Sequence, residues 1–544
     1  MRDGTILRAT VLRPSAAGRF PTLILRTPYG AARALTFTTL CDAAIARGYA
    51  VVAQDVRGRF ASDGEFDPYR QEGRDGYDTI EWAAAAPWSD GRIGTFGLSY
   101  PAAAQWLAAL EGPPHLLAMA PAMTFARPDQ FWFAGGVRDL SWVSWIWLYI
   151  APEERRRRGL PGPRTYEEAV ASWREIGPSL LERRPIADVP EIAEVAPWYL
   201  EWLAHPPDDR WWRWADLAGR YGRISPAVLH LSGWHDESYG PRGALSNHAG
   251  IVDARAGSEP RSRLVVGPWT HGLPPRSADD DTVRTGDRVV GPSARFDFGA
   301  EVLRFMDRHV RGVAETPAEA PVRVFVMGEN RWLAADRWPL PGTLSERLFL
   351  GGTGRDGTLT CRPGPEGWLE LLSDPARPVR DPYASAGGGA HDYRDLAHRP
   401  GTLAFESGPL TAARRVVGAA GAEIFLSTDA PDLDLWVKLL HVEADGTAWN
   451  LMGPGADVLR LGAREGGRDL HQIERVRLEG LLTGNRFAAG DRIRIVVMAS
   501  FAPHFATNPQ TGEPETGTSA TRPARVRIHF GRVRPSCLEL PVVP

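Results

Sequence analysis

Short apolar runs alternate with helix-like patterns over the first 125 residues of the chain. The apolar runs predict strands at 6–12, 21–25, 50–54, 93–96 and 117–121, and the helical patterns cover 77–85 and 102–110. Continuous apolar strands interleaved with helices are typical of a mostly parallel sheet covered on both faces. The alternation returns with strands at 227–231 and 264–266 and a helix at 298–310, so we expect one α/β sheet domain that is interrupted.

The interruption, at about residues 126–222, shows no clear strand and has a helical pattern punctuated by prolines. It is rich in tryptophan, including Trp132, Trp142, Trp145, Trp147, Trp173, Trp198, Trp202, Trp211 and Trp212. We interpret it as a helical cap inserted over the mouth of the sheet. The run Arg155 to Arg158 is expected to form a solvated helix face paired with Glu153 and Glu154 rather than an anion site.

Beyond about residue 318 the helical rhythm disappears and period-two runs lie between Gly, Pro and Asp turns, which predicts an antiparallel sandwich or jelly roll. Residues 387–389 are three glycines and are expected to form a flexible loop. A length of 544 residues also favours two or three domains. The expected division is a catalytic domain of residues 1–125 and 223–317, a cap of 126–222 and a jelly roll of 318–544.

The composition of the chain limits which partners and cofactors are expected. A net charge of −3 gives no reason to expect nucleic acid or an anionic membrane as a partner. The three cysteines, Cys41, Cys361 and Cys537, suggest neither a disulfide framework nor a thiolate site, and the histidines lack metal-ligand spacing. No cofactor or metal is therefore predicted. Residues 140–150 are too few to span a bilayer and no secretory leader is visible, so the expected location is the cytoplasm.

A serine stands where a nucleophile would be presented. Gly97-Leu98-Ser99-Tyr100 lies between the predicted strand 93–96 and the small-residue helix 102–110, as in the strand-to-helix turn that exposes a catalytic serine. Small residues must flank such a turn, and Gly97 and Ala102 meet that need. Pro101 occupies the place where a second glycine often sits, and proline is acceptable in a first helical turn. Taken alone, Ser99 could equally be a helix N-cap.

An acid and a base follow in the order that this fold requires. The segment from Leu229 to Asp236 is expected to be a strand that ends in the aspartate, and the segment from Leu264 to His271 the next strand, ending in the histidine. Either residue alone could be a helix cap or a loop residue, but three members in order are unlikely to coincide by accident. His235 competes as the base. It precedes the acid in the same turn and could hardly face Ser99 while Asp236 oriented it, so His271 is preferred.

Several segments together resemble a known family. In order along the chain, these segments are Arg26-Thr27-Pro28-Tyr29, Gln54-Asp55-Val56-Arg57-Gly58, Ser62-Asp63-Gly64, the serine turn, Gly233 to Asp236, Val266 to His271 and Asn508 to Gly512. They are similar to the cocaine esterase and X-Pro dipeptidyl-peptidase (S15, CocE/NonD) family of α/β-hydrolases. The resemblance implies an α/β-hydrolase domain, a helical cap and a C-terminal jelly roll, with the active site at their junction.

The resemblance also implies site residues. An oxyanion hole would be formed by the hydroxyl of Tyr29 and the backbone N–H of Tyr100. Cap aromatics would wall the acyl pocket, with Trp132 and one of Trp145 or Trp147 contacting substrate. Asp55 and Arg57 are expected to be a buried pair that braces the loops around the serine, because the triad already supplies its acid.

We therefore expect a serine hydrolase that cleaves an ester or amide of a compact, fairly apolar acyl group through an acyl-enzyme. One alternative is a proline-specific dipeptidyl peptidase or an α-amino-acid ester hydrolase. A peptidase of that type needs a carboxylate for the substrate amine, and Glu237 is the candidate, although a solvated loop glutamate is the simpler interpretation. A second alternative is a non-catalytic carbohydrate-binding or scaffold protein. The expected partner is a small-molecule substrate, and the oligomeric state stays open, with a homodimer among the options.

Overall fold

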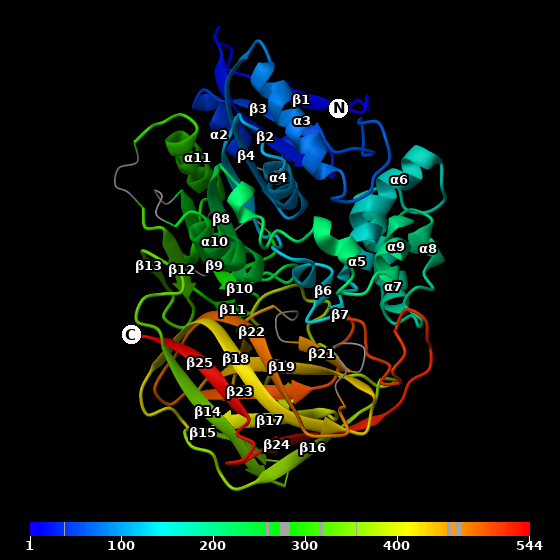
Figure 1. The fold of residues 1–544 in the computed structure, drawn as a ribbon, viewed down its shortest axis with the longest axis vertical. Coiled ribbons are helices and arrows are strands. Elements are labelled where there is room, and N and C mark those ends of the chain that lie inside the picture. The colour runs from blue at the N-terminus through cyan, green and yellow to red at the C-terminus, as the bar shows by residue number, and fades with distance from the viewer. Residues whose placement is uncertain are drawn as a thin grey trace.

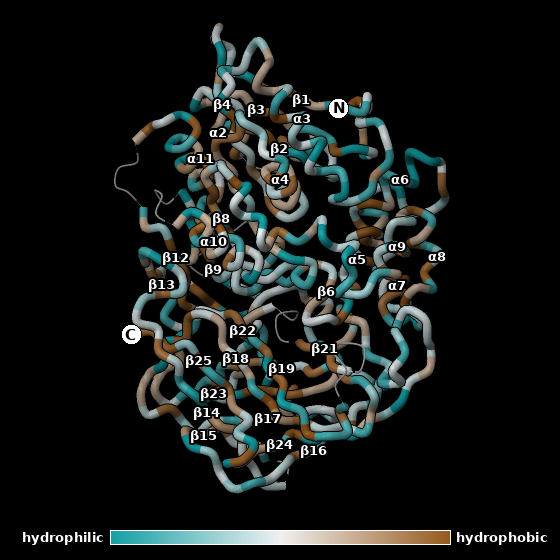
Figure 2. Tube along the Cα trace, in the orientation of Figure 1, coloured by the Kyte–Doolittle hydropathy of each residue, from teal (hydrophilic) through white to brown (hydrophobic). Residues whose placement is uncertain are grey.

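Three bodies make up the protein in the computed structural model (Figure 1): an α/β domain, a helical cap beside it and an all-β domain beneath both. The structure describes residues 1–36, 39–256, 261–272, 283–314, 319–354, 356–453, 458–462 and 469–544. Figure 2 shows hydrophobic segments along the strands of the all-β domain, as expected for strands that fill a core. No helix in these ranges is long and apolar enough to cross a membrane.

The α/β domain is built on a nine-stranded sheet with the order β1-β3-β2-β4-β5-β8-β9-β12-β13. The strands from β3 to β12 in that order run parallel, and β1 and β13 add antiparallel edges. Both β3 and β8 are buried along their whole length, which explains their continuous apolar sequence. The bounds are β1 Ala9–Leu12, β2 Phe20–Thr27, β3 Ala50–Asp55, β4 Ser89–Leu98, β5 Leu116–Ala122, β8 Ala227–His235, β9 Ser262–Thr270, β12 Val322–Val326 and β13 Arg331–Ala335. The predicted α/β class is confirmed.

Helices cover both faces of this sheet. The predicted helices correspond to α3 and α4, which pack on one face, and α11, which packs on the other together with α2. The sequence pattern did not predict α1, α2 and α10. The bounds are α1 Ala31–Thr36, α2 Leu40–Ala46, α3 Glu72–Ala85, α4 Tyr100–Leu110, α10 Arg242–Ala254 and α11 Phe298–His309, with short elements β10 Arg284–Thr285, β11 Arg288–Val289 and η5 Pro292–Ala294 nearby.

The cap enters the chain between β5 and β8, which are neighbours in the sheet, so the sheet closes beneath the insertion. It is helical as expected, but it also holds a small hairpin that the sequence did not reveal, because each of its strands has only two residues. The elements are η1 Pro128–Gln130, β6 Phe133–Ala134, β7 Val137–Arg138, α5 Ser141–Trp145, η2 Ile146–Ile150, α6 Ala151–Arg158, α7 Tyr166–Leu181, α8 Pro190–Ala193, α9 Trp198–Ala204, η3 Arg210–Trp214 and η4 Tyr221–Arg223.

The arginine run of α6 agrees in part with the expected solvated face, because Arg156, Arg157 and Arg158 are exposed. Arg155 is buried, with its guanidinium 4.3 Å from the centre of the Trp147 ring. Glu153 pairs at 3.0 Å with Arg59 of the α/β domain. Only the pair of Arg157 with Glu154, at 3.1 Å, is the local pairing that was expected. The expectation fails only on the buried face of α6, where Arg155 packs on Trp147 and Glu153 pairs with Arg59, because a charge pattern does not show which residues a helix will contact.

The all-β domain comprises strands β14 to β25, which we call the jelly roll. Its strands join in one twelve-stranded system, antiparallel except where β15 runs parallel to β17. This confirms the predicted C-terminal β architecture. The bounds are β14 Leu344–Thr353, β15 Asp356–Thr360, β16 Gly367–Ser373, β17 Thr402–Ser407, β18 Arg414–Thr428, β19 Asp432–Val442, β20 Ala448–Asn450, β21 Val458–Gly462, β22 Glu474–Phe487, β23 Arg492–Met498, β24 Ala524–Phe530 and β25 Cys537–Val543, with the short helix η6 Arg394–His398 between β16 and β17.

The transition between the sheets falls later than the sequence pattern suggests. The expected boundary between residues 317 and 318 itself lies outside the described residues. Beyond it, β12 pairs in parallel with β9 and β13 pairs with β12, so residues 322–335 belong to the α/β sheet. A period-two pattern identifies a strand but not the sheet that it joins.

A buried charge network joins the cap to the jelly roll. Glu515 accepts hydrogen bonds from Arg138 of β7 and Arg460 of β21, both at 2.9 Å, and Arg460 also binds Asp434 of β19. All four side chains are almost fully buried. Buried ions of this kind are stable only when each is paired, so the network fixes the cap relative to the jelly roll.

Candidate active site

Ser99 occupies the turn between β4 and α4. Its backbone has φ 67° and ψ −125°, a conformation that residues other than glycine rarely adopt. The glycine before it is needed for close packing, because a Cβ added at Gly97 would lie 2.5 Å from Cβ of Pro101. Pro101 lies in the first turn of α4, where a missing N–H costs nothing. The strained serine and its glycine are the arrangement expected of a nucleophile elbow.

The acid and the base meet at the carboxyl ends of neighbouring strands. Asp236 follows β8 and His271 follows β9, and these strands pair in parallel. Oδ1 of Asp236 accepts a hydrogen bond from Nδ1 of His271 at 2.9 Å, and it also accepts the N–H groups of Ser238 and Tyr239. Donation from Nδ1 leaves Nε2 of His271 available to take a proton. The aspartate side chain is fully buried, so its contact with the imidazole is shielded from water.

Opposing influences set the basicity of His271. Burial lowers the pKa of its imidazole, while the charge and hydrogen bond of Asp236 and the charge of Glu237 raise it. The net pKa lies above the usual histidine value. His235 behaves differently: burial lowers its pKa to about 3, and its Nε2 lies 3.3 Å from Sδ of Met327. His235 is therefore neutral and packs against Met327.

Tyr29 lies beside the nucleophile. Its hydroxyl accepts a hydrogen bond from Nε1 of Trp145 at 3.0 Å and lies close to the Ser99 side chain. Burial raises the pKa of Tyr29 well above its usual value, so the phenol keeps its proton and can donate it. Tyr100 is the first residue of α4, where a backbone N–H has no acceptor inside the helix. Its own hydroxyl donates to Glu72 at 2.8 Å, so the side chain faces the interior.

Tyr239 is a site residue that sequence reasoning missed. Its hydroxyl shares a hydrogen bond with that of Tyr69, 3.4 Å away, and lies close to the Ser99 side chain. Its ring centre lies 5.5 Å from that of His271. Tyr239 thus lies beside both Ser99 and His271, which share no hydrogen bond with each other in the described part of the chain. Its position three residues after Asp236 was the only available indication.

Asp55 and Arg57 do not form the expected pair. Oδ1 of Asp55 accepts the N–H of Ala31 at 2.6 Å, which fixes the turn that carries Tyr29. Arg57 binds both carboxylate oxygens of Asp75 in α3, at 2.6 and 2.9 Å. Both residues brace loops near the serine, but through different partners. Arg57 lies beyond the end of β3, where strand alternation no longer sets the direction of a side chain.

The three candidate tryptophans lie in different surroundings. Trp145 donates to the Tyr29 hydroxyl, and its ring stacks over Tyr100 with centres 6.3 Å apart. Trp132 is fully buried within the aromatic core of the cap, packed edge-on against Trp202 at 5.0 Å. Trp147 donates through Nε1 to Ser172 of α7. Of the three, Trp145 is the one that the structure brings to Tyr29.

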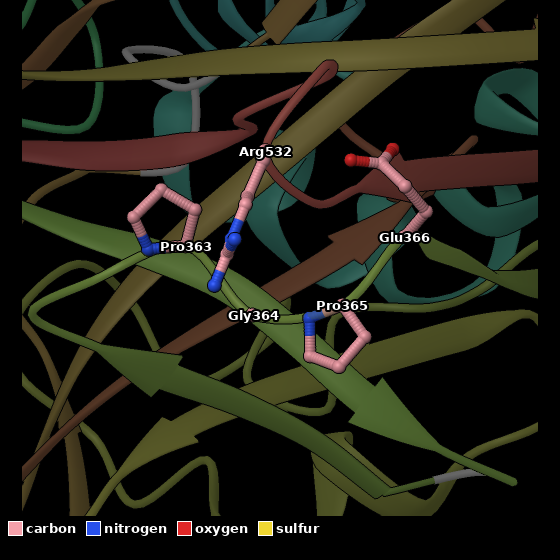
Figure 3. A pocket seen from close by; sticks show the side chains of 5 residues that line it. All are labelled: Pro363, Gly364, Pro365, Glu366 and Arg532. Atoms are coloured by element: carbon pink, nitrogen blue, oxygen red, sulfur yellow. The ribbon is translucent and has the colours of Figure 1, made fainter.

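Two surface hollows of the described residues are alternative candidate sites. One of about 380 Å³ lies in the jelly roll, lined by Pro363, Gly364, Pro365, Glu366 and Arg532 (Figure 3). It holds no nucleophile paired with a base. A second, of about 290 Å³, lies between the α/β domain and the cap and includes Tyr29 in its wall. No cluster of three or more metal-ligating side chains occurs among the residues that the structure describes.

The α/β sheet carries a serine at this strand-to-helix turn and an aspartate-bound histidine after β9. This arrangement places the protein among the serine hydrolases. Residues 3–273 match the model of X-Pro dipeptidyl-peptidase (S15 family), and residues 315–539 match its C-terminal non-catalytic domain. Over the whole chain and 97% of the relative, it is 32% identical to cocaine esterase of Rhodococcus sp. (strain MB1 Bresler). The chain belongs to the cocaine esterase and X-Pro dipeptidyl-peptidase family, of CocE/NonD type.

Other comparisons agree with this fold. A putative serine esterase of Mycobacterium bovis is 25% identical, covering 92% of this chain and 84% of that protein. The solved structure of an α-amino acid ester hydrolase superposes with a TM-score of 0.81 at 23% identity, covering 100% and 95% of the two chains. An aminopeptidase from a marine sediment Thaumarchaeota archaeon gives 0.79 at 22% identity, with the same coverage. At these identities the two structures establish the fold and not the substrate.

Proposed function

We propose that the protein hydrolyses an ester or amide of a compact, fairly apolar acyl group, with Ser99 as nucleophile, His271 as base and Asp236 as orienting acid. The observation that carries this proposal is the 2.9 Å bond from His271 to the buried Asp236, with Tyr239 packed against the imidazole and close to Ser99. A histidine held by a buried carboxylate near a strained serine is arranged for acyl transfer.

The reaction begins when the Ser99 hydroxyl turns from the two phenols toward Nε2 of His271. The imidazole takes the proton as Oγ attacks the acyl carbonyl, and Asp236 stabilises the imidazolium. Tyr29 donates its O–H and Tyr100 its N–H to the oxyanion. His271 then gives the proton to the departing alcohol or amine, which leaves an acyl-enzyme. A water that loses its proton to His271 attacks this ester and releases the acid, and the proton returns to Ser99.

Aromatic rings around the nucleophile support an apolar acyl group. Trp145 donates to the Tyr29 hydroxyl at 3.0 Å, and the ring centre of Tyr239 lies 5.5 Å from that of His271. Such walls bury apolar surface and favour ligands with few charges. Among the relatives, cocaine esterase is named for an ester substrate. A free-amine substrate would need an available carboxylate, and Oε2 of Glu237 already accepts the His271 N–H at 2.9 Å. We therefore place esters ahead of X-Pro peptides.

Purified protein can be tested with p-nitrophenyl acetate, butyrate and benzoate and with an X-Pro p-nitroanilide. Ser99→Ala should lose several orders of magnitude in kcat and should no longer react with a fluorophosphonate probe. The matched control is Ser179→Ala on the exposed face of α7, whose hydroxyl bonds only within its own helix turn, at Ile176. Full activity of Ser99→Ala would refute the mechanism, and a preference for the X-Pro amide would refute the substrate ranking.

A further inference from the structure

Glu237, next to the acid, holds the same histidine by a second contact. Its Oε2 accepts the backbone N–H of His271 at 2.9 Å, while Asp236 accepts the ring Nδ1–H at the same distance. One carboxylate thus fixes the main chain of His271 and the other fixes the orientation of its ring. Burial raises the pKa of Glu237, and the charge and N–H of His271 act in the opposite direction. The residue is half-buried rather than a solvated loop glutamate.

The jelly roll covers this glutamate with a glycine. A Cβ added at Gly388 would overlap Oε2 of Glu237, and the nearest atoms all belong to that carboxylate. At a second point, a Cβ at Gly453 would lie 2.8 Å from the carbonyl oxygen of Asp236. The main chain of the jelly roll therefore packs directly against both carboxylate-bearing residues. Glycine at 388 and 453 permits an approach that any side chain would block.

The glycine loop is itself held from two sides. The carbonyl of Gly389 accepts a hydrogen bond from Asn450 at 3.0 Å, and that of Gly387 accepts one from Nε2 of His391 at 3.2 Å. Asn450 also accepts the N–H of His391 at 2.7 Å. Residues 387–389, which were expected to form a flexible loop, thus pack between these two side chains and Glu237.

We propose that Glu237 is a positioning residue for His271, and that the jelly roll takes part in catalysis by holding its carboxylate in place through the loop at Gly388. The proposal rests on the proposed function above, because it assigns Glu237 a role through the base. It gives the C-terminal domain a task in the chemical step beyond covering the site. It also explains why this glutamate is not available for a substrate amine.

A double-mutant cycle tests the coupling. Glu237→Ala removes the hydrogen bond, and Gly388→Ala displaces the carboxylate by steric overlap. Gly388 does not have the positive φ of Gly387 and Gly389, so alanine fits its backbone. Each variant should lower kcat about 10- to 100-fold with little change in KM, because a displacement of about 1 Å in a catalytic group costs about 100-fold. The double variant should be no slower than Glu237→Ala alone, because the carboxylate that the added methyl group would strike is then gone.

Two controls separate positioning from folding. Gly408→Ala places a methyl group in the jelly roll where no atom lies within 4 Å, at a residue without positive φ, and should leave kcat unchanged. Glu237→Gln keeps an acceptor for the His271 N–H and should keep most of the activity that Glu237→Ala loses. Thermal melting of every variant shows whether a loss of kcat is only a loss of folded protein.

The pH profile supplies a readout that packing alone would not move. Asp236 and Glu237 are the charges that act on the imidazole, and Tyr239 packs against its ring, while Gly388 brings only main chain from the jelly roll. Glu237→Gln removes a charge that raises the pKa of His271, so the acidic limb of kcat/KM should move to lower pH.

The positioning role of Glu237 would be overturned if both Glu237→Ala and Gly388→Ala kept the wild-type kcat. It would also be overturned if the losses of kcat in the two single variants simply multiplied in the double variant. An unmoved acidic limb in Glu237→Gln, with kcat lost as in Glu237→Ala, would overturn it as well. If Ser99→Ala stays inactive in the same assays, only this inference fails. If Ser99→Ala stays active, the proposed function fails first.

Discussion

Tyr29→Phe tests the oxyanion arrangement with the smallest possible change. The substitution removes one oxygen and leaves the ring that packs edge-on against Tyr149 at 5.7 Å. It deletes the donor that we assign to the transition state, and it also deletes the acceptor of the Trp145 N–H. The backbone N–H of Tyr100 remains as the second donor, so the site should be weakened and not abolished.

The expected loss follows from the value of one preorganised donor. Removal of such a donor typically costs about 2.7–4 kcal/mol of transition-state stabilisation, or about 100- to 1000-fold in kcat. Because the donor strengthens its bond only as the oxyanion forms, kcat and kcat/KM should fall together while KM changes little. The unpaired Trp145 N–H should cost about 1 kcal/mol of folding stability, at the low end for an orphaned donor because Trp145 is only half-buried.

Stopped-flow acylation with p-nitrophenyl butyrate measures the relevant step, because release of p-nitrophenolate reports formation of the acyl-enzyme. Trp145→Phe is the matched control: it breaks the same 3.0 Å hydrogen bond but keeps the Tyr29 hydroxyl. Its acylation rate should fall much less than that of Tyr29→Phe. An acylation rate of Tyr29→Phe close to that of wild type, or equal losses in the two variants, would refute the assignment of Tyr29 to the oxyanion.

Two further predictions concern charge. Because the pKa of His271 is raised, kcat/KM should decline as pH falls through a value above the usual imidazole pKa of 6.5. Asp236→Asn should move this acidic limb of the pH profile to lower pH and reduce kcat about 10⁴-fold. An unshifted acidic limb would argue against the pairing of Asp236 with His271. In the network that joins the cap to the jelly roll, burial raises the pKa of Glu515, but the charges of Arg460 and Arg138 outweigh burial and lower this pKa to about 2. The ionised Glu515 therefore stabilises the folded protein above its unfolded pKa near 4.5, and this stabilisation is lost as the pH falls toward about 2. Glu515→Gln should cost about 3–5 kcal/mol of unfolding free energy at neutral pH and flatten this acid dependence of the melting temperature, and melting curves that match wild type across pH would contradict the buried pairing.

Much of the α/β domain could be predicted because its strands are short and continuously apolar. The segments 50–54 and 117–121 coincide closely with β3 and β5. Helices α1 and α2 escaped prediction because they are short, and α2 is stabilised by packing against α11 rather than by a strong period of its own. The two-residue strands β6 and β7 are below the length at which alternation can be recognised.

The sequence did not predict which residues the charged side chains would contact. Both Asp55 and Arg57 were expected to brace loops, but Asp55 binds a main-chain N–H and Arg57 binds Asp75. The sequence also contained no indication that Arg155 would be buried against Trp147. A charged side chain carries no local indication of its partner, because that partner can come from any element that the fold brings within about 4 Å.

The sequence by itself determined the succession of strands along the chain, the α/β and β architectures and the residues at which serine, aspartate and histidine follow a strand. Those features depend on local periodicity and on turn chemistry, which neighbouring residues encode. Only the tertiary structure decided that Tyr239 lies beside both Ser99 and His271, that Glu237 holds the histidine main chain and that Gly388 reaches this glutamate from another domain. These contacts join residues that are far apart along the chain, and the packing of whole domains sets their distances.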